Sequence, residues 1–261
     1  MPSASSFIDD LQSRGRYHFS TEEAAKALGS SLSATQAALR RLKAKGEIAD
    51  PHRGFHVVVP PEYRRLGCLP AEHFIPQLMQ HLGESYYVAL LSAAAYHGAA
   101  HQKPQRFQVM VPRRRRPIAC GEVHVQFISR NDMVETPIVE RNTPRGVIRI
   151  ASAAATAHEL VGYPEHAGGL NNVATVLAEL AESLDAEALI AEARRVPLAW
   201  VQRLGYLLTL VEASELAAAL EPVVQARNPF PVALAPSATA AGCPGDARWK
   251  VSINVQVEPD L

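Results

Sequence analysis

One short stretch of the chain, residues 33–45, carries polar and basic side chains that no acidic residue interrupts. Hydroxyl, amide and guanidinium groups can hydrogen-bond the edges of DNA bases, and lysine and arginine can neutralise phosphates and release their counterions. Side chains of these types on one helix therefore indicate contact with a nucleic acid. The candidates are Ser33, Thr35, Gln36, Arg40, Arg41, Lys43 and Lys45.

The apolar spacing in this stretch predicts a helix over residues 34–45, with Ser33 as its N-cap. Ala37, Ala38 and Leu42 are expected to form its buried stripe. A helix of this size fits the major groove of DNA. The side chains in its first half that point away from the stripe are expected to meet base edges. These are Thr35, Gln36 and Arg40.

Two helical patterns precede the basic stretch, and a hairpin pattern follows it. Ser20 and Glu23 have the spacing of a capping box at the start of the nearer helix. Two strand patterns, residues 47–50 and 55–59, enclose a turn with a basic tip. Helices followed by a hairpin predict a winged helix-turn-helix within residues 1–70. The tip residues that could reach a groove or a phosphate are His52 and Arg53.

Charge is distributed unevenly along the chain. The whole chain has no net charge, but residues 1–70 contain ten Lys and Arg against seven Asp and Glu, which leaves a deficit in the remainder. A basic excess at one end is typical of a DNA-reading module attached to another domain. The alternative is that the basic helix is a solvated face of a winged-helix protein-interaction domain.

A second basic feature is a run of four arginines between Pro112 and Pro117, in a segment that joins two predicted strands. Such a run can hold nucleic-acid phosphate or an acidic patch on a partner protein. It is equally consistent with a solvated loop, because charge runs are commonly exposed. The run consists of Arg113, Arg114, Arg115 and Arg116.

Pro60 and Pro61 end the hairpin pattern, and a domain boundary is expected near residue 70. We expect an α+β fold, with an N-terminal winged helix-turn-helix (1–70) followed by a larger mixed α/β domain (71–261). The predicted helices of the larger domain cover residues 74–82, 86–98, 153–160, 171–184, 186–194, 198–210 and 212–220. Its predicted strands cover residues 107–111, 123–128, 146–150 and 249–257.

The larger domain lacks the common sequence signals of catalysis and cofactor binding. It contains no GxGxxG, P-loop, HExxH or GxSxG motif, and Cys68, Cys120 and Cys243 lack metal-ligand spacing. We therefore expect no enzyme activity, no cofactor, no metal and three reduced thiols. No run approaches the ~20 apolar residues of a membrane span, and the N-terminus does not read as a signal peptide. A cytoplasmic location is expected.

The chain resembles the AbiEi family of antitoxins from bacterial type IV toxin–antitoxin systems over almost its full length. Apart from the winged helix, the resemblance rests on four stretches. These are residues 86–98 (YYVALLSAAAYHG), 109–116 (VMVPRRRR), 143–147 (TPRGV) and 246–260 (DARWKVSINVQVEPD).

This resemblance implies a regulator that represses its own bicistronic operon by binding inverted repeats in double-stranded DNA through the N-terminal domain. It also implies that the C-terminal domain, an AbiEi-type antitoxin domain, counteracts a nucleotidyltransferase-like toxin, with or without a stable complex between the two proteins. One departure is Ala157-His158-Glu159-Leu160, where an acidic pair is expected in the family.

Two alternatives remain open. The first is a winged-helix transcriptional regulator whose C-terminal domain binds a small effector, which predicts an apolar pocket with a few polar groups. The second is an enzyme acting on nucleic acid, which requires a carboxylate cluster for a metal ion. The residues that could form such a cluster are Asp132, Glu135 and Glu140.

Overall fold

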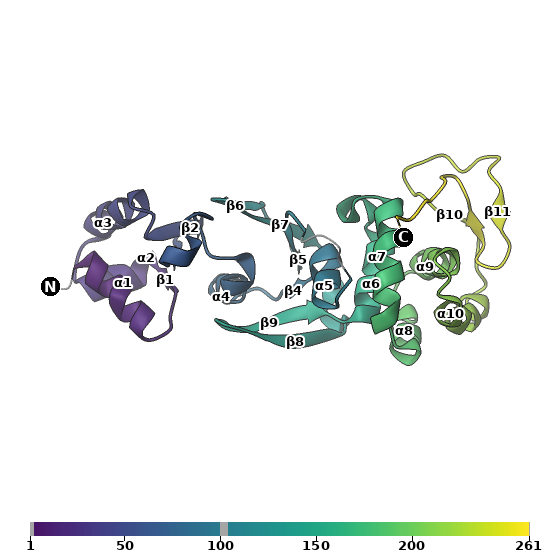
Figure 1. Cartoon of the computed structure of the whole chain (residues 1–261), viewed down its shortest axis with the longest axis horizontal. Helices are drawn as coiled ribbons and strands as arrows, with labels where there is room; N and C mark the ends of the chain where they lie inside the picture. Colours follow the sequence, from purple (N-terminus) through teal and green to yellow (C-terminus); the bar gives the residue numbers. More distant parts are fainter. Residues whose placement is uncertain (1–2, 100–103, 261) are drawn as a thin grey trace. The chain divides into compact units, whose positions relative to one another are not determined.

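The computed structural model describes residues 3–99 and 104–260, and the described residues form ten α-helices and several β-sheets (Figure 1). The fold is mixed α+β, as the sequence predicts. Contacts divide the chain into two compact units. Unit one comprises the chain up to Tyr87, Gln105–Met133 and Glu140–Arg149, and unit two comprises the remainder. This division does not follow the boundary expected near residue 70, which stays a prediction.

The N-terminal module, residues 3–59, folds as three helices and a three-stranded antiparallel sheet with the strand order β1-β3-β2 (Figure 1). Its core includes Phe7 and Phe19, whose rings meet edge to face 5.2 Å apart. The predicted capping box of Ser20 and Glu23 is present. The elements are α1 (Ala4–Ser13), β1 (His18–Ser20), α2 (Thr21–Leu28), α3 (Leu32–Ala44), β2 (Ile48–His52) and β3 (Phe55–Val58).

The start of α3 differs from the prediction. Its N-cap is Ser31, whose hydroxyl accepts a hydrogen bond from the amide of Ala34 over 3.3 Å. Ser33 lies inside the first turn and is exposed. Both serines have the chemistry of a cap, but Ser31 has the extended backbone that a cap requires (φ −65°, ψ 155°).

The rest of unit one includes a connector, helix α4 and the strands β5, β6 and β7. In the connector, two short 3₁₀ turns precede α4. Strand β7 lies between its two neighbours, parallel to β5 and antiparallel to β6. The observed β5 matches the predicted strand over residues 107–111. The elements are η1 (Pro61–Tyr63), η2 (Ala71–His73), α4 (Ile75–Leu82), β5 (Phe107–Val111), β6 (Ile118–Cys120) and β7 (Val123–Ser129).

These strands belong to a six-stranded sheet with the order β6-β7-β5-β4-β9-β8. The helix predicted over residues 86–98 is wrong in its first part, which forms strand β4. Leu90, which begins the helix that follows, has a positive φ of 51°. This backbone geometry separates the strand from the helix. The remaining elements are β4 (Tyr87–Val88), α5 (Leu90–Tyr96), η3 (Met133–Glu135), β8 (Ile138–Thr143) and β9 (Gly146–Ala151).

The larger part of unit two is helical. The five helices predicted after residue 150 are all present, although the second ends at Leu180 in a short 3₁₀ turn and the last runs past Pro222. Some polar side chains of these helices are buried, including His158 and Glu159 of α6. The elements are α6 (Ala153–Gly162), η4 (Pro164–Ala167), α7 (Leu170–Leu180), η5 (Ala181–Ser183), α8 (Ala186–Ala193), α9 (Leu198–Leu210) and α10 (Ser214–Ala226).

The long strand predicted over residues 249–257 is wrong. Only Val251–Ser252 forms a strand there, β12, between β10 (Val232–Ala233) and β11 (Gly245–Asp246). Trp249 is fully buried, and Lys250 has a positive φ of 52°, which breaks the extended geometry before the strand starts.

Candidate nucleic-acid interface

Helix α3 presents its basic residues to solvent. Its buried positions are Thr35, Leu39 and Leu42, at spacings of four and three residues, which define one helical face. The face predicted from Ala37 and Ala38 is therefore displaced by part of a turn, since both alanines are only partly buried. The exposed candidates on and just after the helix are Ser33, Gln36, Arg40, Arg41, Lys43 and Lys45.

Thr35 was expected to meet base edges, and this is wrong. Its side chain is 1% exposed, and its hydroxyl lies 2.7 Å from the hydroxyl of Ser30, with which it shares a hydrogen bond. Burying a hydroxyl group costs free energy unless it is hydrogen-bonded, and the bond with Ser30 reduces this cost for Thr35. Thr35 therefore fixes the start of α3 against the preceding turn and does not face solvent.

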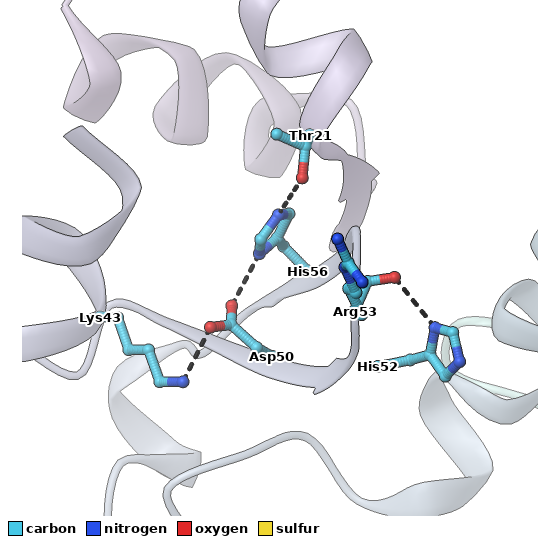
Figure 2. A network of polar contacts seen from close by, with 6 residues as sticks. All are labelled: Thr21, Lys43, Asp50, His52, Arg53 and His56. Carbon is cyan, nitrogen blue, oxygen red and sulfur yellow. Dashed lines mark hydrogen bonds and ion pairs between the residues drawn. The ribbon is translucent and has the colours of Figure 1, made fainter. Parts of the chain in front are cut away.

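A chain of polar contacts links α3 to the hairpin and to α2, as Figure 2 shows. The Lys43 ammonium donates to one oxygen of Asp50 over 2.7 Å. The second oxygen lies 2.6 Å from Nδ1 of His56, and the other ring nitrogen of His56 lies 2.8 Å from the Thr21 hydroxyl. Because an ionised carboxylate only accepts, Nδ1 donates to Asp50 and leaves Nε2 to accept from Thr21 in the neutral ring.

The charges in this network stabilise one another. Burial alone would raise the pKa of Asp50, but the hydrogen bonds from His56 and Lys43 outweigh it and hold that pKa below the ordinary value. The hydrogen bond to Asp50 in turn raises the pKa of Lys43. Lys43, predicted as a phosphate contact, is thus engaged with the hairpin, and sequence reasoning missed Asp50 and His56 altogether.

The tip of the β2–β3 hairpin carries the remaining predicted contacts. Arg53 is exposed, while His52 is half-buried with Nδ1 3.0 Å from the carbonyl oxygen of Arg53 (Figure 2). Gly54 closes the turn with a φ of 78°. Of the five exposed cations of the helix and the tip, Lys43 pairs with Asp50, and within the part of the chain that the structure describes no ion pair involves the other four. These are Arg40, Arg41, Lys45 and Arg53.

The four consecutive arginines are not equivalent. Arg115 is half-buried and forms a bidentate ion pair with Glu84. Its Nε lies 2.7 Å from Oε2 of Glu84, and its Nη2 lies 2.6 Å from Oε1. This hydrogen bond lowers the pKa of Glu84. The other three side chains, Arg113, Arg114 and Arg116, are exposed. One arginine therefore anchors the loop, and the other three are available to an acidic ligand.

A further arginine, unnoticed as a functional group in the sequence, joins the N-terminal module to the β8–β9 turn within unit one. The guanidinium carbon of Arg145 lies 3.4 Å from the ring centroid of Tyr17 and 5.9 Å from that of Tyr63. Gln77 donates a hydrogen bond to the Arg145 carbonyl oxygen over 2.9 Å. This cation–π contact orients the module against the sheet of its own unit.

The two alternative functions require a metal site made of carboxylates and a pocket for a small effector. Among residues 3–99 and 104–260 there is no group of three or more His, Cys, Asp and Glu side chains that could hold a metal ion. Asp132 instead pairs with Arg130 over 2.8 Å.

Unit two contains a cavity of about 530 Å³ lined by residues that include Tyr163, His166 and Val255. No helix in the described part of the chain combines the length and apolarity of a membrane span.

Comparison with known proteins relates the fold to that of solved structures. The crystal structure of the RV2827C protein from Mycobacterium tuberculosis superposes with a TM-score of 0.67 at 17% sequence identity, covering 95% of this chain and 90% of that one. At this identity the likeness shows a shared fold alone. None of the curated proteins compared with the chain matches it.

The family comparison concerns the stretch that follows α4. Residues 87–210 match the AbiEi antitoxin C-terminal domain, which includes the LSAAAYHG and VPRRRR elements. This match confirms the resemblance found in the sequence, and it supports an antitoxin role. Residues 87–210 thus match an AbiEi antitoxin C-terminal domain, which is consistent with an AbiEi family antitoxin.

Proposed function

We propose that the chain is a DNA-binding antitoxin that represses its own toxin–antitoxin operon and counteracts a nucleotidyltransferase-like toxin. In this proposal the N-terminal module is a winged helix-turn-helix whose α3 enters the major groove of operator inverted repeats. The toxin is counteracted by the C-terminal domain without catalysis. The domain match supports the antitoxin part, and the surface of the N-terminal module supports the DNA part.

The observation that carries the DNA part is the set of four unpaired cations. Arg40, Arg41 and Lys45 lie on or beside the exposed face of α3, and Arg53 lies at the tip of the following hairpin. Unpaired cations keep their full attraction for phosphate, whereas a paired cation such as Lys43 must first give up its partner. Gln36 is exposed on the same helix and can pair with a base edge.

The salt dependence of operator binding tests this proposal. Arg40→Ala with Arg41→Ala should weaken binding and flatten the plot of log affinity against log salt by about 2, close to one unit for each lost phosphate contact. Arg194→Ala with Arg195→Ala removes two adjacent arginines from the end of α8 and serves as the matched control. An unchanged slope in the first variant would overturn the assignment of α3.

Antitoxicity should separate from DNA binding in the same variants. The Arg40, Arg41 double variant should lose repression of an operon reporter and still rescue growth when the adjacent nucleotidyltransferase-like toxin is expressed. Point variants suit this test better than truncation, because unit one combines the chain up to Tyr87 with two later segments. Loss of rescue in a folded double variant would contradict the division of labour.

The cavity in unit two favours a second candidate, a winged-helix regulator with an effector site. Its volume falls within the ~300–1,000 Å³ range of small-molecule pockets. That candidate predicts operator affinity that changes with a metabolite and no growth rescue against the toxin. The growth assay therefore separates the two functions.

A further inference from the structure

Two buried cysteines of unit one lie on segments that are far apart in the sequence and near each other in the fold. Cys68 belongs to the connector after the hairpin, and Cys120 ends strand β6. Cys68 is fully buried and Cys120 is 9% exposed, and both are free thiols. The sequence alone predicts reduced thiols here, because nothing in their spacing relates them.

The backbones beside these cysteines are in direct contact. The Glu122 amide donates a hydrogen bond to the Leu66 carbonyl oxygen over 2.8 Å. A Cβ atom at Gly121 would lie 2.9 Å from the Cα atom of Gly67 and would collide with the Leu66 carbonyl. The two segments cross at a pair of glycines, and each glycine is the chain neighbour of one of the cysteines.

The two thiols interact and differ in acidity. The interaction with the Cys68 thiol lowers the pKa of Cys120, and the charge of Lys43 supports this shift, whereas burial and the charge of Asp50 oppose it. The interaction with Cys120, together with burial, raises the pKa of Cys68. Cys120 is therefore the sulfur that ionises first and reacts as a nucleophile, and Cys68 keeps its proton.

The pair also touches the network that holds α3 to the hairpin. Strands β2 and β6 lie in contact, and the Asp50 backbone lowers the pKa of the Cys120 thiol. The side chain of the same Asp50 pairs with Lys43 of α3 and with His56 of β3 (Figure 2). A change in the position of Cys120 on β6 thus acts on the neighbouring strand β2, which carries Asp50.

We propose that Cys68 and Cys120 are a site of oxidative modification, at which a hydroperoxide converts the two thiols into an intramolecular disulfide that weakens DNA binding by the N-terminal module. The effect on DNA rests on the function proposed above. The disulfide itself does not depend on that function.

The reaction balances with hydrogen peroxide as the oxidant. The Cys120 thiolate attacks one peroxide oxygen, so that an S–O bond forms, the O–O bond breaks and hydroxide leaves as water after taking up a proton. The Cys68 sulfur then attacks the Cys120 sulfenic acid. An S–S bond forms, the S–O bond breaks, and the second oxygen leaves as water with the Cys68 proton. Two thiols lose two electrons, and one peroxide is reduced to two waters.

The disulfide should disturb the hairpin for a geometric reason. The sulfurs of a disulfide lie about 2.05 Å apart, so Cys120 must move towards Cys68. Strand β6, which carries Cys120, lies in contact with strand β2. The movement of Cys120 therefore disturbs strand β2 near Asp50, the residue that positions α3. We expect operator affinity to fall about fivefold or more on oxidation, equivalent to about 1 kcal/mol.

The first experiment maps the disulfide in the full-length protein. Cys243→Ser removes the third thiol, which lies in unit two, and leaves the proposed pair. After titration with hydrogen peroxide and alkylation of free thiols, mass spectrometry of peptides should find Cys68 linked to Cys120. Cys120→Ser and Cys68→Ser should each abolish the link. Two free thiols in the oxidised Cys243→Ser protein, or links only between molecules, would overturn the proposal.

The second experiment measures operator binding by the Cys243→Ser protein before and after oxidation, and again after reduction with dithiothreitol. A reversible loss of affinity supports the coupling to α3, and an unchanged affinity of the disulfide form overturns it. If the reduced protein binds no operator, the proposed DNA function fails, and the peptide map still decides the disulfide. The map needs only Cys68 and Cys120 in place, so it remains decisive if the Cys68→Ser or the Cys120→Ser variant fails to fold.

Discussion

Lys43 of α3 and Asp50 of β2 form an ion pair 2.7 Å long that ties the basic helix to the strand after it. The Lys43 side chain is half exposed, so the pair alone contributes little to stability. Its effect is larger because the same carboxylate also accepts from His56, which is 10% exposed. Asp50 is therefore a positioning residue for α3.

Asp50→Asn should destabilise the N-terminal module by about 1 kcal/mol, because it removes the charge that both partners need. The pKa of Asp50 lies below its ordinary value of 3.8, so its stabilising effect is complete above that pH and is lost as the pH falls below it. Urea titrations of variant and wild type at pH 7 should differ, and the two curves should converge in acid.

The matched control for this prediction is Asp10→Asn. Asp10 pairs with Arg14 over 2.8 Å on the surface of α1, and both side chains are largely exposed. This substitution should change the unfolding free energy by less than about 0.5 kcal/mol. Equal effects of the two variants would show that Asp50 has no special role.

The parts of this site that sequence reasoning found are those set by local chemistry. The capping box of Ser20 and Glu23 needs only residues three apart, and it is present. Thr35 was misplaced because its hydroxyl partner, Ser30, lies in the preceding turn, and no periodic pattern reveals that hydrogen bond. Asp50 and His56 are six residues apart on opposite strands and meet only when the hairpin forms.

The strand predicted over residues 249–257 rests on alternating apolar and polar residues. The packing of Trp249 overrides this pattern. Trp249 is held by α9, where Thr209 accepts a hydrogen bond from its indole nitrogen over 3.1 Å. Gln202 of the same helix donates to the Trp249 carbonyl oxygen over 3.0 Å. These contacts fix the backbone in a bend before Val251, where the alternating pattern predicts extended chain.

Gly205→Ala should disrupt this attachment. A Cβ atom at Gly205 would collide with the ring of Trp249, which is fully buried. Overpacking of this kind costs about 1–3 kcal/mol. We expect a lower melting temperature and a red shift of tryptophan fluorescence as the ring gains contact with water. Gly245→Ala, where the nearest atom to the new Cβ is 3.9 Å away, is the control and should leave both measurements unchanged.

His158 should make stability depend on pH in the mildly acidic range. The ring is fully buried, and burial lowers its pKa to about 4, although the hydrogen bond with the Ala154 carbonyl opposes the shift. The unfolded chain takes up this proton near pH 6.5, whereas the folded chain does not. Its contribution is thus complete above pH 6.5 and falls as the pH drops towards 4, by about 3 kcal/mol in all.

His158→Asn tests this assignment, because it supplies an amide donor near the position of Nδ1 but cannot be protonated. Its unfolding free energy should decline less than that of the wild type between pH 6.5 and 4.5. His124→Asn changes an exposed histidine of β7 and should leave the wild-type pH dependence intact. A parallel decline of all three proteins would place the titrating group elsewhere.

Base readout and phosphate contact should separate on α3. Gln36 can pair with a base edge through its amide, so Gln36→Ala should relax preference at one operator position, with a loss of about 1–3 kcal/mol on the cognate base only. Lys45 follows the helix, and Lys45→Ala should weaken binding equally to all sequences and reduce the salt slope by about 1.

Thr35→Val keeps the shape of a side chain that is 1% exposed. It should leave base preference unchanged while lowering stability, because the Ser30 hydroxyl loses its partner. Competition binding with single-base operator variants measures all three effects, and a change of base preference in Thr35→Val would restore that residue as a direct contact.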